Sequence, residues 1–161
     1  MNDILSEFVY GGIDGIITTF SIIAGSAGGN LTRKVILILG ISNVLSDGYS
    51  MGVSRYLSSK TEITQGILQQ KNALFSGIAT FMSFVIIGLM PVIPFMFNEG
   101  RIAQNQSLIT ALIVFFLIGS VKGYYLNESI FKNGLETLSI GISAAAISYY
   151  IGKILNDKYN L

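Results

Sequence analysis

Residues 8–25 read FVYGGIDGIITTFSIIAG, an apolar stretch with one carboxylate, Asp14, near its middle. Lipid disfavours such a charge, because an aspartate at the centre of a membrane helix costs about 2.5–3.5 kcal/mol on insertion scales. A chain that carries this cost usually uses the charge. The stretch therefore predicts both a membrane-spanning helix and a functional role for Asp14.

The composition extends this prediction to the whole chain. Of 161 residues, 51% are hydrophobic and 12% are charged, whereas soluble domains average about 25% charged residues. Five apolar stretches are each close to the ~20 residues that cross a hydrocarbon core. They run over about 8–25, 35–57, 73–97, 108–126 and 135–155. We predict an all-α membrane protein with five transmembrane helices, short loops and a single transmembrane domain covering 1–161.

Five spans would place the termini on opposite sides of the membrane. The basic residues of the connections fall equally on the two sides, so they indicate no orientation. A large soluble core is disfavoured, because the five stretches leave too little polar sequence for a surface.

The residue types exclude several functions. Cysteine and histidine are absent, which removes thiolate sites, cysteine nucleophiles and imidazole ligands. A net charge of +1 gives no electrostatic footprint for nucleic acid. No serine has a plausible base near it, so an intramembrane hydrolase is disfavoured. We expect no enzyme, no nucleic-acid partner and no bound cofactor; any metal must be held by oxygen or thioether donors.

Polar residues in the second stretch share one helical face. Asn43, Asp47, Ser50, Met51 and Ser54 follow the spacing i, i+4, i+7, i+8, i+11. The pattern predicts a polar stripe along the second helix.

The first stretch carries a matching stripe of Asp14, Thr18, Ser21 and Gly25. Asp14 and Asp47 lie almost equally far along the sequence from the connecting loop. Two antiparallel helices would then bring both carboxylates to one depth near mid-membrane, with Met51 about one turn deeper along the second helix.

These side chains suit a borderline divalent metal. Carboxylates neutralise the cation, and a thioether adds a soft donor that fits Fe²⁺, with Mn²⁺ and Zn²⁺ as alternatives. Two empty carboxylates in low dielectric should share a proton, which metal binding would expel. The predicted metal ligands are Asp14, Met51 and Asp47, and Asn43, Ser50 and Thr18 are candidate path-lining residues. Two simpler interpretations remain: Met51 only packs, and the Asp14 carboxyl is only hydrogen-bonded to Thr18.

Other residues have structural interpretations. Gly11 and Gly15, four residues apart, indicate a close helix approach that is either a homodimer contact or packing within the chain. Pro91 and Pro94 should kink or end the third helix. Arg55 and Lys122 are expected to be snorkelling anchors. The connection 58–72 is compatible with a short surface helix and holds one carboxylate, Glu62.

Four segments together resemble the vacuolar iron transporter family. They are FVYGGIDGIITTF at 8–20 followed by Ala24-Gly25, GISNVLSDGYSMGVSRYLS at 40–58, MPVIP at 90–94 and YIGK at 150–153. The resemblance implies five helices per subunit, a homodimer, and an ion path between subunits. It implies export of cytosolic Fe²⁺ into a compartment in exchange for protons, with a cytosolic N-terminus. The family's intramembrane metal ligands correspond to Asp14 and Met51.

The chain also departs from that family. Many members carry a glutamate-rich cytosolic insert between the second and third helices, where this chain has only 58–72. Members often have an acidic residue at the position of Arg55, and many have a small residue at the position of Asp47. Asp47 is therefore predicted from helix register alone.

The hypothesis is a homodimeric transporter, in the vacuolar or another intracellular membrane, that moves Fe²⁺ or Mn²⁺ out of the cytosol by proton exchange. Its partners would be the divalent metal, protons and the lipid bilayer. The alternatives are a carrier of another solute and a non-transporting membrane scaffold with a vestigial site.

Overall fold

The structure is a computed structural model that describes residues 2–65 and 72–159. The described residues form six helices and no strand. The helices are α1 (Asn2–Gly28), α2 (Arg33–Thr64), α3 (Ala73–Leu89), α4 (Ile93–Phe97), α5 (Gly100–Tyr125) and α6 (Ile130–Tyr159). The all-α prediction is confirmed. Residues 58–64, expected in a connection, complete α2, and 66–71 lie outside the described residues.

Four helices, α1, α2, α5 and α6, are long and apolar enough to span a membrane. Helix α3 is apolar but has only 17 residues. Within the third stretch, 73–97, α3 ends at Leu89 and the chain resumes as α4, which confirms the kink or end expected from Pro91 and Pro94. Proline lacks an amide hydrogen and is favoured in the first turn of a helix, which fits Pro94 near the start of α4. Ser107 of α5 donates a 2.6 Å hydrogen bond to the Pro91 carbonyl and stabilises this break.

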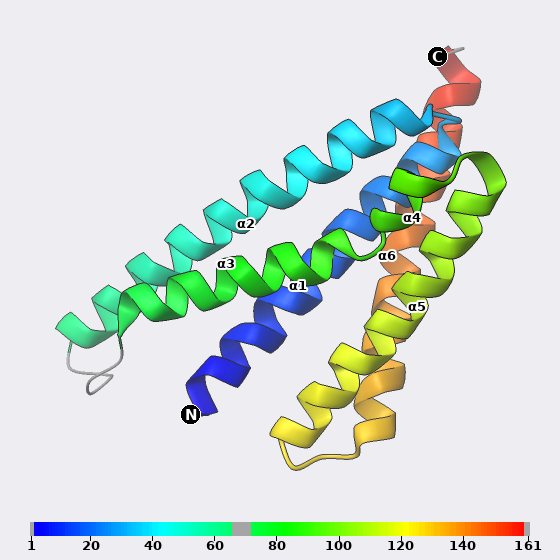
Figure 1. Ribbon diagram of the computed structural model, residues 1–161. Coiled ribbons are helices and arrows are strands. Elements are labelled where there is room, and N and C mark those ends of the chain that lie inside the picture. Colours follow the sequence, from blue (N-terminus) through cyan, green and yellow to red (C-terminus); the bar gives the residue numbers. More distant parts are fainter. Residues whose placement is uncertain (1, 66–71, 160–161) are drawn as a thin grey trace.

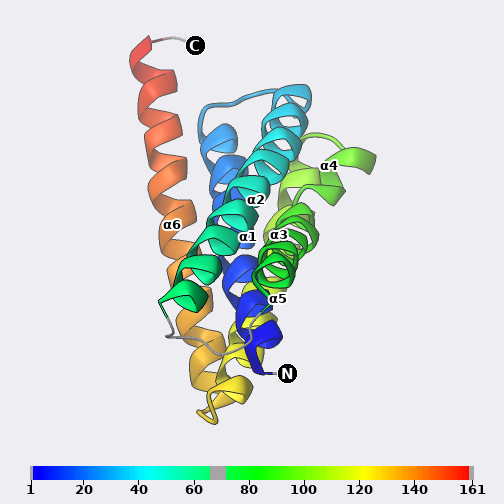
Figure 2. The same cartoon turned by 90° about the vertical axis from the view of Figure 1, so that its left-hand side faces the viewer.

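Helix α1 lies between two helix pairs (Figure 1). The α2–α3 pair and the α5–α6 pair diverge toward the end of the bundle that holds the N-terminus, and α1 packs most extensively on α3 and α6. Figure 2 shows the N- and C-termini at opposite ends of the bundle, the arrangement expected for an odd number of crossings.

Glycines set the distance between α1 and α3. A Cβ atom on Gly15 would lie 2.5 Å from the Phe84 carbonyl oxygen, and one on Gly11 would lie 2.6 Å from the Thr80 carbonyl oxygen. The two backbones therefore touch within one chain. The interpretation of Gly11 and Gly15 as a subunit contact is wrong, and packing within the chain is confirmed.

Arg33, the first residue of α2, binds the end of α4. Its Nε donates to the Phe95 carbonyl at 2.6 Å, one terminal nitrogen donates to the Met96 carbonyl at 2.8 Å, and the other pairs with Glu99. A cation at the last carbonyls of a helix is favourable, so Arg33 both caps α4 and holds α2 against it.

Gly15→Ala should lower the stability of the subunit itself, by about 1–3 kcal/mol, because the added methyl meets backbone that cannot rotate away. Gly29→Ala is the matched control, since a Cβ there would have its nearest neighbour at 3.5 Å. Thermal unfolding in detergent measures both. Equal melting temperatures for the two variants would contradict the packing described here.

Candidate functional site

The polar stripe of α2 is only partly covered by the chain. Asn43 donates a 2.6 Å hydrogen bond from Nδ2 to Asp47 Oδ2, one turn further along, and both side chains are half-buried. Ser50 and Ser54 are exposed and Met51 is half-buried. The predicted face exists, and much of it is open at the surface of the single chain.

Asp14 is half-buried in α1. The Thr18 hydroxyl donates a 2.8 Å hydrogen bond to the backbone carbonyl of Asp14, which leaves the carboxylate to face other groups. Asp47 lies on α2, a helix that contacts α1.

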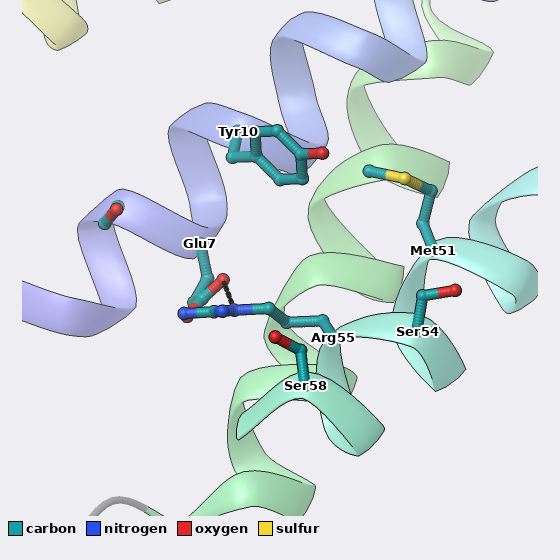
Figure 3. Close-up of a pocket in the computed structure, with 7 residues that line it drawn as sticks. Glu7, Tyr10, Met51, Ser54, Arg55 and Ser58 are labelled. Carbon is teal, nitrogen blue, oxygen red and sulfur yellow. Dashed lines mark hydrogen bonds and ion pairs between the residues drawn. The ribbon is translucent and has the colours of Figure 1, made fainter. Parts of the chain in front are cut away.

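Two cavities adjoin along α1. The α1–α2 cavity has a volume of about 400 Å³ and is lined by Ser6, Glu7, Tyr10, Met51, Ser54, Arg55 and Ser58 (Figure 3). The α1–α5 cavity has a volume of about 390 Å³ and is lined by Ser6, Val9, Tyr10, Ile13, Asp14, Ile17, Lys122, Tyr125 and Leu126. Ser6 and Tyr10 border both. The structure therefore places Met51 and Asp14 in neighbouring cavities rather than in one.

A buried ion pair crosses the α1–α2 cavity. The Glu7 side chain is only 4% exposed, and Arg55 of α2 reaches it with Nε 2.7 Å from both carboxylate oxygens and a terminal nitrogen 2.6 Å from Oε1 (Figure 3). Thr80 of α3 donates to Oε2 at 3.2 Å. The second terminal nitrogen of Arg55 lies 3.7 Å from Glu62. The expectation that Arg55 is a snorkelling anchor is wrong, because Arg55 joins α1 to α2 inside the bundle.

Glu7 is the site residue that the sequence patterns did not single out. It precedes Asp14 by seven residues, two helical turns, so both stand on one side of α1. That spacing could have identified Glu7 as a candidate site residue. The sequence could not have predicted that Glu7 pairs with Arg55, because the two residues are 48 positions apart.

Lys122 brings a cation to the α1–α5 cavity that Asp14 also lines. Its Nζ lies 3.2 Å from Glu136 Oε2 on α6. Its place is the last turn of α5.

Acidic donors are sparse here. Within 2–65 and 72–159, no group of three or more aspartate, glutamate, histidine or cysteine side chains is close enough to hold a metal. A metal bound to this chain would need thioether, hydroxyl, amide or water ligands beside one or two carboxylates, or donors from a second copy.

The sequence model of the VIT family matches residues 5–66 and 62–153, which together cover most of the chain. The chain belongs to the VIT family. This confirms the resemblance drawn from residues 8–20 and 40–58. With four apolar candidate spans among its described residues, this VIT family member is an integral membrane protein.

Some members of the family match this chain over nearly all of its residues, and others over a shorter segment. It is 23% identical to vacuolar iron transporter 1 of Eucalyptus grandis, over 96% of this chain and 88% of the relative, and 20% identical to the Arabidopsis thaliana protein of that name, over 95% and 86%. It is 41% identical to a vacuolar iron transporter of Toxoplasma gondii over 61 residues, which are 38% of this chain and 20% of that protein. The relatives are named as transporters, which supports the expectation that the chain is not an enzyme.

The family match also concerns the connection between α2 and α3, where many family members carry an insert. The Eucalyptus alignment spans 218 positions, more than the 161 residues of this chain, so that relative carries residues that this one lacks. The match to the family breaks at 62–66, where α2 leads toward α3. This is where the sequence predicts a shortened connection.

Proposed function

We propose that the protein transports a divalent transition metal, Fe²⁺ foremost and Mn²⁺ as the alternative, out of the cytosol in exchange for protons. The membrane is that of the vacuole or another intracellular compartment, as the names of the relatives suggest. The N-terminus lies in the cytosol, and the chain crosses the membrane five times, α3 and α4 together making the third crossing.

The observation that carries this proposal is the Asp14 carboxylate. It stands near the middle of an apolar helix, is half-buried and borders a cavity. Ionisable groups inside membrane segments mark ion pathways and proton relays, because they are too costly to keep otherwise. A scaffold would gain stability by losing this charge.

The donors favour a borderline metal over Ca²⁺ or Mg²⁺. Met51 lines the cavity next to the one that Asp14 lines, and a thioether is a soft ligand that hard cations do not use. Asp14, Asp47 and Met51 are the proposed ligands, with Asn43, Ser50 and Thr18 lining the path.

Partial exposure supports a path between two copies. Asp14, Asp47 and Met51 are only half-buried in the single chain, and Ser50 is exposed. Membrane proteins turn such groups toward the interior of a bundle or a water-filled cavity. A second copy covering this face would enclose them and bring a second set of donors to the same metal.

Asp14→Asn should reduce metal uptake to background while leaving the protein folded, since removing the charge eases its burial in the membrane. Fe²⁺ uptake by purified protein in liposomes measures this. Asp157→Asn, at an exposed position near the end of α6, is the control and should transport normally. Uptake by Asp14→Asn at the wild-type rate would reject the site and favour a scaffold or another solute.

Met51→Leu should keep the fold, at a cost below about 1.5 kcal/mol, because leucine has nearly the same volume. Loss of the thioether should weaken Fe²⁺ transport more than Mn²⁺ transport, because Mn²⁺ depends more on oxygen ligands. Met82→Leu on the exposed face of α3 serves as the control. Equal losses for both metals would mean that Met51 only packs.

Asp47→Asn should flatten the pH dependence of uptake. In the wild type, uptake should rise with pH, because protons compete with metal for the two carboxylates. Without Asp47 the remaining pair, Asp14 and Met51, should still bind some metal. Initial rates in liposomes at several pH values provide the measurement, and an unchanged profile would contradict the carboxylate coupling.

A further inference from the structure

Glu7 and Arg55 both line the α1–α2 cavity and form an ion pair with each other. Burying the Glu7 carboxylate is tolerable because the guanidinium compensates its charge. The Arg55 side chain remains 25% exposed against 4% for Glu7, so the guanidinium has access to water that the carboxylate lacks. The buried Glu7 carboxylate therefore requires a cation beside it, but that cation could be one other than Arg55.

The same cavity holds donors for a different cation. Met51 lines it one turn from Arg55 along α2, and hydroxyls of Ser6, Tyr10, Ser54 and Ser58 complete the lining (Figure 3). A carboxylate, a thioether and hydroxyl oxygens suit a borderline divalent metal. Arg55 and such a metal would compete for the same Glu7 oxygens.

Arg55 has a second carboxylate within reach. Glu62, also on α2, has an oxygen 3.7 Å from Nη1 of Arg55, and its side chain is 31% exposed. The guanidinium can therefore leave Glu7 without losing a counter-ion, by moving outward along its own helix. Glu62 is the only carboxylate of the 58–72 connection.

We propose that Glu7 is the first metal-ligating group on the transport path and that Arg55 is a tethered cation which an arriving divalent metal replaces, Arg55 then pairing with Glu62. The proposal rests on the proposed transport function and extends it to the cytosolic mouth. The formal charge of Glu7, Arg55 and Glu62 is −1 when empty and +1 with a divalent cation bound. The mouth thus attracts a metal and, once loaded, repels the next and favours passage toward Met51.

The first test measures metal-dependent stability, which requires no transport. Arg55→Met leaves Glu7 buried without its guanidinium, so its melting temperature should fall by about 5–10 °C in metal-free detergent. Adding Mn²⁺ should recover most of this loss, by a larger shift than in the wild type, because the metal fills the place of the guanidinium.

Two control variants make the result specific to Glu7. Glu7→Gln with Arg55→Met removes both charges, so it should melt near the wild type and show no extra response to Mn²⁺. Arg33→Met breaks the ion pair at the other end of α2, where Glu99 is exposed, and should also show no extra response. A Mn²⁺ shift as large in the double variant as in Arg55→Met would overturn the proposal.

Transport provides the second test. Glu62→Gln removes the receiving carboxylate and should raise the Mn²⁺ concentration for half-maximal uptake by about two- to fivefold, the range of a partly exposed ion pair. Arg55→Lys keeps the charge but not the two-pronged contact, so it should lower that concentration. Arg55→Lys also keeps the proposal testable if Arg55→Met does not fold, and unchanged values for both variants would overturn it.

These results separate the two proposals. If the wild type moves no metal but Arg55→Met is stabilised by Mn²⁺ through Glu7, the transport function fails and the metal site at Glu7 stands. If the wild type transports and Arg55→Met shows no Glu7-dependent stabilisation, the transport function stands and the exchange at Glu7 is rejected.

Discussion

Helix α1 can lie at the centre of the bundle because glycines stand where its backbone meets its neighbours. Gly11 and Gly15 bring it against α3, and Gly25 and Gly28 bring it against α6. These contacts use two sides of the helix. The face that remains, with Ser6, Tyr10 and Asp14 at successive turns, borders the two cavities. The position of Asp14 on the open face of α1 thus follows from the close packing of glycines on the other sides of the same helix.

Helix α2 packs mainly on α3, and two of its arginines bind other helices. Arg33 binds the last carbonyls of α4 at one end, and Arg55 binds Glu7 toward the other. Between these points α2 packs on α3 but only lightly on α1, so Asn43, Asp47 and Met51 remain half-buried. Charge pairs of this kind contribute less net stability than their Coulomb energy suggests, because both groups lose hydration. Their effect here is to fix where α2 stands and to leave its polar face accessible.

Arg55 affects where a VIT family member of this kind would capture metal. A chain with the shortened connection after α2 has few carboxylates with which to collect metal before the membrane, and the cavity at that end already contains a guanidinium. The proposed metal capture would therefore take place at the ion pair of Glu7 and Arg55. The same residue would make the mouth selective for divalent over monovalent cations, because only the higher charge competes well with a bidentate guanidinium.

The sequence by itself determined the helices, the membrane class, the family and the charge at Asp14, because apolar length and local spacing are properties of adjacent residues. It also determined that Asn43, Asp47 and Met51 share a face. The tertiary structure decided which neighbour each face meets: Gly11 and Gly15 meet α3 of the same chain, Glu7 meets Arg55, and Asp14 and Met51 line separate cavities. The break of the third apolar stretch into α3 and α4, in contrast, follows the local signal of Pro91 and Pro94. Spacing fixes the direction of a side chain around its own helix, but its partner depends on how helices distant in sequence pack together.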